Sequence, residues 1–514
     1  MLIKTYGSAV YGVEAITIAV EVDVNNQGKH YFIVGLPDNA IKESLERVES
    51  AIKSDQYYMP RTKLVVNLAP ADIKKTGTAF DLPIAIGTLA ATGQINEPER
   101  IGEYIIMGEL GLDGIVKPIK GALPIAIQAE RDGFKGLILP VANAKEAAMV
   151  NNIEVFGVGH LNEVIDFFKQ KSILIPTTIN TREAFLHAQS DYEIDFSEVK
   201  GQHNIKRALE IAAAGGHNAI LIGPPGAGKT MLAKRLPTIL PPLTLEEALE
   251  TTKIHSVAGK LPEHSTLVSK RPFRNPHHTI SDVALVGGGG NPQPGEISLA
   301  HNGVLFLDEL PEFKRTVLEV MRQPMEERKV TISRAKIALD FPASFMLIAS
   351  MNPCPCGFFN HPEKECTCPP GAVQKYLNKV SGPLLDRIDL HVEVTPVVFN
   401  ELSSQNKSEK SEVIRQRVIK ARELQANRYS NFSTIHANAQ MNNKLLKEIC
   451  KIDTVGQNLL KTAMEKLNLS ARAYDRILKV SRTIADLSES ENIKAEHLAE
   501  AIQYRSLDRE GWSV

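Results

Sequence analysis

One stretch of the chain has the residue types and spacing of a phosphate-binding loop. Residues 223–230 fit the pattern G-x-x-x-x-G-K-[ST], after an apolar run that predicts a buried strand and before a segment of helical periodicity. Glycines let the backbone turn tightly and bring successive N–H groups onto anionic oxygens. We expect Lys229 to contact the outer phosphates of a nucleotide and Thr230 to bind Mg²⁺. The predicted nucleotide-binding residues are Gly223, Pro224, Pro225, Gly226, Ala227, Gly228, Lys229 and Thr230.

Two adjacent carboxylates could complete the chemistry of this site. Val304–Leu307 are four consecutive apolar residues that predict a buried strand, and Asp308 and Glu309 follow directly. Ligands of a parallel α/β sheet bind at the carboxyl ends of its strands. We therefore expect Asp308 to hold Mg²⁺, directly or through water, and Glu309 to polarise an attacking water. Together with the loop, these residues predict hydrolysis of a nucleoside triphosphate such as ATP.

Most of the cysteines gather in one place and indicate a candidate metal site. Two C-x-C pairs are separated by nine residues and comprise Cys354, Cys356, Cys366 and Cys368. Four thiolates can bind Zn²⁺ tetrahedrally, whereas the alternative is a redox-sensitive or merely local pair of cysteines. His361 lies between the two pairs and could replace one ligand. The fifth cysteine, Cys450, has a helical apolar context typical of a core residue.

Length and composition limit the class of protein. A chain of 514 residues is too long for one core and predicts about three domains. The formal net charge is -1, so any binding of nucleic acid must use local patches. No segment approaches the ~20 apolar residues of a membrane span, and the first residues lack the apolar core of a secretory signal. With no disulfide framework, these features predict a cytoplasmic location.

Composition and periodicity divide the chain into three units joined by two linkers. The N-terminal unit mixes strands and helices without strict alternation, which predicts an α+β fold, and the last unit is all helical. The linkers are polar or lack periodicity. The expected boundaries are 1–170 for the α+β unit, 171–194 for the first linker, 195–400 for the nucleotide module with a cysteine insertion at 353–370, 401–411 for the second linker and 412–514 for the helical unit.

The N-terminal unit resembles the C-terminal domain of Lon-type proteases, a ribosomal S5 domain 2-like fold. The likeness lies in residues 75–81, 108–114 and 118–123. Lon proteases use a nucleophilic serine and a lysine base, and the corresponding positions here hold Ala79 and Leu123. Neither side chain can attack a carbonyl or accept a proton. The resemblance therefore implies a peptidase fold without peptidase activity, and ordinary α+β patterning is the alternative.

The nucleotide module resembles AAA+ ATPases, which have a parallel α/β core and a helical lid. By this resemblance, Asn352 is the first sensor, a polar side chain near the γ-phosphate, and Arg387 is the arginine finger, which reaches the nucleotide of a neighbouring subunit. An intramolecular Arg–Asp pair is the alternative for Arg387. Arg472, near the start of an amphipathic helix, resembles the second sensor of the lid, with Arg476 as the other candidate. A surface arginine is the alternative for both.

Two insertions carry basic residues that could contact DNA. The first, residues 253–302, contains Arg271 and Arg274 on a loop rich in proline and glycine, which suits phosphate contact and base stacking but equally a subunit interface. The second, Lys329–Phe341, has two β-rich runs around Arg334 and Lys336, which predicts a hairpin with a basic tip. In ring helicases of the superfamily such a hairpin projects into the central pore. A solvated turn is the alternative.

The whole combination, in this order, resembles the ComM/YifB family of magnesium-chelatase-like AAA+ ATPases. Membership implies a homo-hexameric ring that binds single-stranded or branched DNA, hydrolyses ATP with Mg²⁺ and drives branch migration in homologous recombination during natural transformation. Recombination proteins are then candidate partners. The main rival is a chelatase-type motor acting on a protein or metal-insertion partner, although we do not expect the chelatase subunit to carry this N-terminal unit. An ATP-dependent protease and a DNA-binding scaffold are further alternatives.

Overall fold

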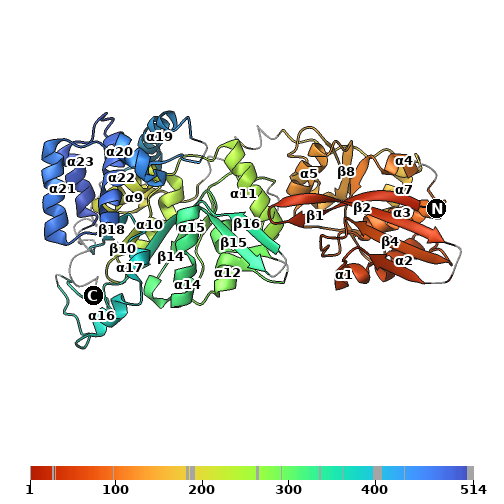
Figure 1. Ribbon diagram of the computed structural model, residues 1–514, viewed down its shortest axis with the longest axis horizontal. Coiled ribbons are helices and arrows are strands. Elements are labelled where there is room, and N and C mark those ends of the chain that lie inside the picture. The colour runs from red at the N-terminus through yellow and green to blue at the C-terminus, as the bar shows by residue number, and fades with distance from the viewer. Residues whose placement is uncertain are drawn as a thin grey trace.

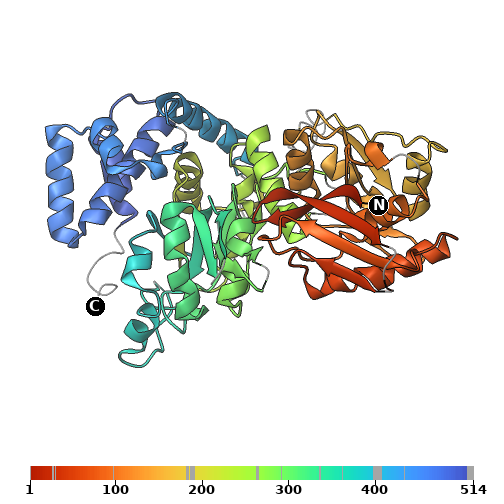
Figure 2. The same cartoon turned by 45° about the vertical axis from the view of Figure 1, so that its right-hand side comes forward.

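The computed structural model describes residues 2–25, 28, 30–95, 98–180, 185, 192–261, 266–290, 292–334, 337–361, 363–396, 408–432 and 434–505. Three units lie in a row along the long axis of the molecule, and a parallel-sheet core separates the N-terminal unit from the helical unit (Figure 1, Figure 2). Part of the predicted linker sequence, 181–184, 186–191 and 401–407, lies outside the described residues.

The N-terminal unit is built on a mixed sheet of seven strands in the order β3-β4-β2-β1-β5-β8-β9. β1 pairs antiparallel with β2, and β2 with β4, whereas the other neighbours run parallel. A separate two-stranded ribbon joins β6 to β7. The strands are β1 (Leu2–Tyr11), β2 (Glu14–Asn25), β3 (Tyr31–Val34), β4 (Lys63–Ala69), β5 (Tyr104–Ile106), β6 (Glu109–Leu110), β7 (Val116–Lys117), β8 (Gly136–Pro140) and β9 (Glu154–Val158).

One helix forms the centre of this unit. Every residue of α3 is buried, because its sequence is apolar on all sides. A Cβ on Gly87 would lie 2.7 Å from the Val22 side chain, so the glycine allows α3 to approach β2 closely. The only charged residue of α3, Asp81, pairs with Arg47 at 2.7 Å. The helices are α1 (Asn39–Lys42), α2 (Ser44–Ser54), α3 (Asp81–Ala91), α4 (Pro98–Ile101), α5 (Ala122–Arg131), α6 (Val141–Ala147) and α7 (Leu161–Phe168).

The core unit holds a sheet of five parallel strands in the order β11-β14-β17-β10-β18. The three middle strands are fully buried, which explains their continuous apolar sequences. Because all five run parallel, their carboxyl ends share one edge of the sheet. The strands are β11 (Phe273–Arg274), β14 (Val304–Leu307), β17 (Met346–Met351), β10 (Ala219–Ile222) and β18 (Leu390–Glu393).

Short helices connect these strands. α11 carries a complete capping box, in which Thr244 and Glu247 satisfy each other's backbone N–H groups. The helices of the core are α9 (His203–Gly215), α10 (Lys229–Arg235), α11 (Leu245–Ala258), α12 (Asp282–Val286), α13 (Glu296–Leu299), α14 (Arg315–Val320), α15 (Arg322–Glu327), α16 (Ala372–Leu377) and α17 (Gly382–Leu385), with 3₁₀ turns at η1 (Phe196–Glu198), η2 (Leu236–Thr238) and η3 (Leu310–Glu312).

Two hairpins emerge from the core, one from each predicted insertion. The first pairs β12 (Gly287–Gly288) with β13 (Gln293–Pro294), and the second pairs β15 (Lys329–Arg334) with β16 (Ile337–Pro342). The two hairpins pack together: Gly287 lies so close to Ile332 that a Cβ on the glycine would be 3.0 Å from the Ile332 side chain. The hairpin predicted for residues 329–341 is therefore present. The two hairpins, which are separated by 34 residues in the chain, lie side by side.

The helical unit packs on the core through a large apolar cluster that also contains buried polar contacts. α19 and α22 lie against α9. His217, fully buried just after α9, contacts the Thr483 hydroxyl on α22 at 2.8 Å. Side chains cap α20, α21 and α22 at their first turns. The elements are α19 (Ser411–Arg428), η4 (Asn438–Gln440), α20 (Asn443–Ile449), α21 (Thr454–Leu467), α22 (Ala471–Leu487) and α23 (Ala495–Gln503).

The N-terminal unit contacts the core through α5 and α11. Leu123, where the Lon resemblance places a catalytic lysine, is fully buried in a cluster that includes Leu243 and Ala248 of the core. Ala79 lies elsewhere, at the border of a different apolar cluster. The Ser256 hydroxyl also donates a hydrogen bond to the Glu146 carboxylate across this contact. Leu123, at the position where the Lon resemblance expects a lysine, thus packs the N-terminal unit against the core.

We predict that Leu123→Ala weakens this contact. Removing a fully buried leucine side chain typically costs about 2–4 kcal/mol of unfolding free energy. Thermal unfolding of the intact chain should therefore begin at a lower temperature than in the parent. Leu112→Ala, which removes the same atoms from a leucine that is 63% exposed, is the matched control and should leave the curve unchanged. Equal unfolding curves for the two variants would contradict the packing role.

Candidate nucleotide-binding site

The predicted phosphate loop connects β10 to α10 at the carboxyl edge of the parallel sheet. Gly226 and Gly228 have φ values of 78° and 82°, a left-handed backbone that glycine adopts without strain. Gly223 lies against β18, where a Cβ would be 2.3 Å from the carbonyl oxygen of Val394. The loop therefore requires glycine for two reasons, its turn and its close approach to a neighbouring strand.

Lys229 lies inside the loop rather than on its surface. Its Nζ donates to the carbonyl oxygens of Gly223 and Pro224 at 2.7 and 2.9 Å, and to Asn352 Oδ1 at 3.2 Å. Burial lowers the pKa of the ammonium group, while the nearby carboxylates of Asp308 and Glu309 oppose that shift. The loop thus holds the Lys229 ammonium group close to the Asn352 side chain, which directly follows β17.

The Asp308 carboxylate connects two further elements at this edge. Thr230 Oγ1 donates to Asp308 Oδ2 at 2.7 Å, and the Ser350 hydroxyl donates to the other carboxylate oxygen. A hydroxyl beside a carboxylate is the oxygen ligand pair that Mg²⁺ takes in phosphate-loop enzymes. Our sequence analysis did not identify Ser350. It is the one polar residue of the otherwise apolar strand β17, and it is 1% exposed.

The Glu309 side chain projects from the same edge of the sheet into solvent. Its φ of 53° is left-handed, a strained conformation for a residue with a side chain, and its side chain is 59% exposed. His278 Nδ1 lies 3.6 Å from Glu309 Oε2. The sequence pointed to the loop around His278 as a candidate for DNA contact or, equally, for a subunit interface. In the structure that loop also brings an imidazole to the carboxylate that would activate water.

The two arginines predicted for DNA contact on this loop have internal partners instead. Arg271 donates to the carbonyl oxygens of Pro241 and Asn302 at 2.6 and 2.7 Å, and its side chain is 14% exposed. Arg274 forms two hydrogen bonds with Glu296, at 2.6 and 2.7 Å. These contacts occupy both guanidinium groups and secure the loop. The structure therefore shows that both arginines stabilise the loop, and their contact with DNA stays a prediction.

Arg387 lies at the opposite edge of the sheet, just before β18 begins. Its guanidinium forms an ion pair with Glu326 at 2.7 Å and donates to the Pro383 carbonyl at 2.7 Å. The side chain is 10% exposed, whereas that of Glu326 is 54% exposed. The predicted finger thus has an intramolecular partner, as the alternative interpretation expects, although the partner is a glutamate on α15 and faces solvent.

Arg472 and Arg476 lie at this same edge, close to Arg387. Arg472 Nη1 is 3.4 Å from Asp386, and its side chain is 62% exposed. Arg476 is 2.9 Å from Asp389, which is 1% exposed. Burial alone would raise the pKa of the Asp389 carboxyl, but Arg476 and His217 outweigh it and hold that pKa well below its usual range. Of the two lid arginines, only Arg472 is largely exposed to solvent.

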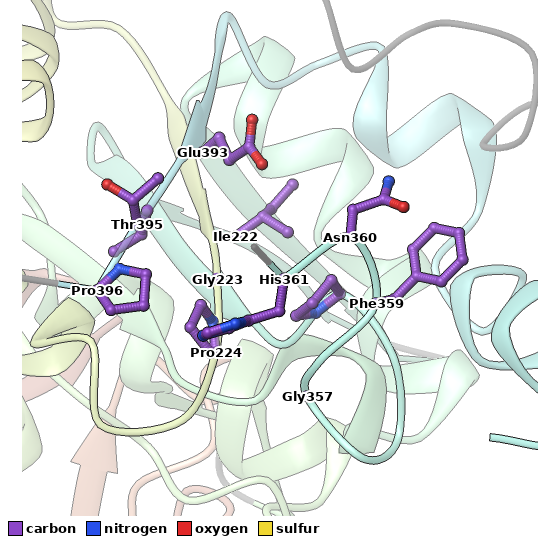
Figure 3. Close-up of a pocket in the computed structure, with 12 residues that line it drawn as sticks. Ile222, Gly223, Pro224, Gly357, Phe359, Asn360, His361, Glu393, Thr395 and Pro396 are labelled. Carbon is purple, nitrogen blue, oxygen red and sulfur yellow. The ribbon is translucent and has the colours of Figure 1, made fainter. Parts of the chain in front are cut away.

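The remaining predicted site residues fall into two groups. Arg334 ends β15, while Lys336 lies outside the described residues, so nothing is shown of the basic tip itself. The four clustered cysteines come together beside the phosphate loop. Next to them is an open pocket of about 590 Å³, with walls from the phosphate loop, the cysteine segment and the residues after β18 (Figure 3). Its lining includes Gly223, Pro224, Gly357, Phe359, His361, Glu393 and Thr395.

The parallel order of the strands, the phosphate loop and the acidic strand end define the class of protein as a phosphate-loop ATPase of the AAA+ type. Three family models match the chain. They are described as magnesium chelatase, subunit ChlI (residues 195–402), subunit ChlI of Mg-chelatase (20–143) and magnesium chelatase, subunit ChlI C-terminal (408–505). The second model covers much of the N-terminal unit, so our expectation that a chelatase subunit would lack this unit no longer separates the alternatives.

Full-length relatives define the family more narrowly. The chain is 43% identical over 506 residues to competence protein ComM of Haemophilus influenzae, covering 98% of this chain and 97% of that protein. It is 42% identical over 507 residues to the uncharacterised protein YifB of Escherichia coli, covering 98% and 96%. A local likeness to Lon protease 2 of Bacillus subtilis, 32% over 154 residues, covers about a quarter of each chain, 27% and 26%. The chain belongs to the ComM/YifB family of magnesium-chelatase-like AAA+ ATPases.

Membership has consequences for cofactors and assembly. ATP and Mg²⁺ are the cofactors of such ATPases, and AAA+ proteins are typically oligomeric. A search of the described helices finds none with both the length and the apolar character needed to cross a membrane.

We predict that Arg476 and Arg472 differ in what they contribute. Arg476→Ala leaves the buried Asp389 carboxylate without its cation, which should lower the unfolding free energy by about 3 kcal/mol. Arg472→Ala removes an exposed partner and should change it by less than about 0.5 kcal/mol. Thermal or denaturant unfolding of both variants measures the difference. A similar loss for both would contradict the assignment of Arg476 as the structural arginine.

Proposed function

We propose that the protein is a ring-forming ATPase that moves DNA, with each ATP bound between two copies of the chain. The observation that supports hydrolysis is a pair of hydrogen bonds at one sheet edge, from Lys229 to Asn352 and from Thr230 to Asp308. Lys229 would release its carbonyl partners to bind the outer phosphates, and Thr230 and Asp308 would hold Mg²⁺. Glu309 would polarise the attacking water, and Asn352 would position it.

The placement of two arginines supports a shared site. Arg387 and Arg472 lie at the amino edge of the sheet, while the phosphate loop lies at its carboxyl edge. Strands β10 and β18 have four residues each, so the edges are separated by about 13 Å along the strands. Neither arginine points to the phosphate loop of its own chain. Both are therefore assigned to the nucleotide of a neighbouring copy, which implies a head-to-tail ring, for which we propose six copies.

A subunit-mixing experiment tests this arrangement. Lys229→Ala and Arg387→Ala should each reduce ATP hydrolysis strongly, since an arginine finger contributes about 10³-fold or more. Co-assembled from equal amounts, the two variants should recover activity, because about a quarter of randomly formed interfaces then combine an intact loop with an intact finger. Lys229→Ala mixed with Asp308→Ala is the control and should recover nothing, since both changes damage the same half-site. Absence of recovery in the first mixture would refute action in trans.

The two adjacent hairpins support DNA as the substrate that moves. The β15–β16 hairpin carries Arg334 at the end of β15 and Lys336 in its turn sequence, and it packs against the β12–β13 hairpin. Cationic side chains on a projecting hairpin suit contact with phosphates of single-stranded or branched DNA. One similar protein is named a competence protein. On this basis we assign the motor to branch migration during recombination in natural transformation, working beside recombination proteins.

The DNA assignment makes a prediction about salt dependence. Replacing Arg334 and Lys336 together by alanine should weaken DNA binding and reduce the slope of log affinity against log salt by about 2. ATP hydrolysis without DNA should stay at the parental level, while stimulation by DNA is lost. Lys329→Ala is the matched control, because Lys329 is paired with Asp340 at 2.7 Å at the base of the same hairpin. An unchanged affinity and slope would remove the hairpin from DNA contact.

A second candidate function is favoured by the family models, whose descriptions all name a magnesium chelatase subunit. In that case the same ATP site would remodel a protein partner or assist metal insertion. The two candidates differ in the ligand that stimulates ATP hydrolysis. Stimulation by single-stranded or branched DNA supports the first, whereas no response to DNA and a response to a protein partner supports the second.

A further inference from the structure

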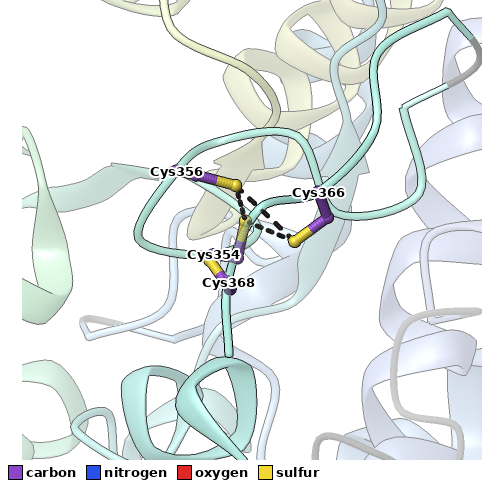
Figure 4. Close-up of side chains that lie close together, drawn as sticks. All are labelled: Cys354, Cys356, Cys366 and Cys368. Carbon is purple, nitrogen blue, oxygen red and sulfur yellow. Dashed lines mark hydrogen bonds between the residues drawn. The ribbon is translucent and has the colours of Figure 1, made fainter. Parts of the chain in front are cut away.

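Four cysteine side chains meet at one point directly after β17. The Sγ atoms of Cys354, Cys356, Cys366 and Cys368 all lie within 4.8 Å of one another (Figure 4). They come from two chain segments that return to each other across a loop of nine residues. Bringing four sulfur atoms this close together costs free energy unless a cation binds them, because the thiolates that form on deprotonation repel one another.

The distances between sulfur atoms distinguish a metal site from disulfides. Three pairs measure 3.3, 3.5 and 3.8 Å. A tetrahedral Zn²⁺ with Zn–S bonds of about 2.3 Å places its sulfur ligands about 3.8 Å apart. A disulfide requires about 2.05 Å. The arrangement is thus close to that of a zinc site and needs only small shifts to accept the ion.

The surroundings indicate that all four ligands are cysteines. His361 Nδ1 accepts hydrogen bonds from the backbone N–H groups of Glu363 and Lys364, both at 3.1 Å, so this nitrogen caps a turn. The ring itself lines the neighbouring pocket (Figure 3). Meanwhile the Phe359 backbone N–H donates to Cys354 Sγ at 3.3 Å, which stabilises a thiolate as outer groups do in metal centres. The open alternative of a histidine ligand is therefore not favoured.

The cysteine loop, residues 353–370, lies against the phosphate loop. Gly357 has a φ of 85°, and a Cβ on it would be 2.5 Å from Pro225 Cδ. The loop begins one residue after Asn352, the side chain that contacts Lys229. Its residues also form one wall of the pocket whose opposite wall includes Gly223 and Pro224. An ion that holds the four cysteines together would thus also fix the position of the pocket wall formed by the cysteine loop.

We propose that Cys354, Cys356, Cys366 and Cys368 bind one Zn²⁺, which fastens the cysteine loop against the phosphate loop and shapes the nucleotide site. Binding releases the remaining thiol protons to solvent and leaves the ion and its ligands with a net charge of -2. The metal has no open coordination position, so its role is structural. The metal assignment is independent of DNA movement, whereas the fastening role rests on the proposed nucleotide site.

The test begins with metal content, which needs no enzymatic activity. Full-length protein purified under reducing conditions, without chelators, should contain about one zinc per chain by elemental mass spectrometry. The double variant Cys366→Ser/Cys368→Ser should lose it. Cys450→Ala, which removes a cysteine in the lid core outside the cluster, should retain it. Zinc in the double variant at the parental level, no zinc in the parent, or disulfides among the four cysteines would overturn the site.

Two further measurements test the fastening role. The double variant should be cut by protease within residues 353–370 while the N-terminal unit stays resistant, and it should bind a fluorescent ATP analogue several-fold more weakly. Gly357→Ala keeps all four cysteines, so it should retain zinc yet also bind the analogue more weakly, because its methyl group meets Pro225. Unchanged nucleotide binding in both variants would refute the fastening role, whereas a parent that binds zinc but no nucleotide would refute the proposed ATP site alone.

Discussion

The hydrogen bonds to Asp308 depend on the parallel register of the core sheet, and the rest of the site depends on them. The carboxylate ends β14 and receives hydroxyl groups from Thr230, after β10, and from Ser350, on β17. These strands are neighbours only because the sheet order places β17 between β14 and β10. A shift of register by one residue would point Asp308 to the opposite face of the sheet and separate it from both hydroxyls.

The same parallel order also divides the functional residues between two edges. Every strand starts at the edge that carries Arg387 and Asp389 and finishes at the edge that carries the phosphate loop. In the arrangement that we propose, a single copy would therefore present half of a phosphate-binding site at each edge. The intramolecular partners of Arg387, Glu326 and the Pro383 carbonyl, occupy the guanidinium in the isolated chain. On assembly, Arg387 would exchange its ion pair with the exposed Glu326 for contact with the more concentrated negative charge of a triphosphate.

The N-terminal unit combines a local likeness to Lon protease with a packing role against the core unit. A local likeness to Lon protease covers 27% of the chain. At the position that corresponds to a catalytic lysine, Leu123 packs against the core unit. A leucine there stabilises the contact between units, which a buried ammonium group would oppose.

Several features followed from the sequence alone because they rest on local pattern. The glycine loop, the apolar strand before Asp308 and the hairpin at residues 329–341 each have a signature within about fifteen residues. Strand β1 was not predicted, because its polar and apolar residues do not alternate strictly along Leu2–Tyr11. The sequence of residues 39–52 has the amphipathic pattern of one helix, whereas the structure divides this segment at Glu43 into α1 and α2.

The tertiary structure decided which of the charged residues are free to act. The sequence offers Arg271 and Arg274 as candidates for DNA contact. It offers Arg472 as the second sensor, with Arg476 as the other candidate. The acidic partners of these guanidinium groups lie elsewhere in the chain, so the sequence does not show which of them are paired. Glu296 and Asp389 bind two of them, whereas Arg472 remains exposed. Likewise, His278 and Ser350 reach the site only through strand order. From the sequence alone we could infer a phosphate-binding loop and a cluster of cysteines. Which side chains meet at these two places depends on contacts between distant segments of the chain, so only folding determines it.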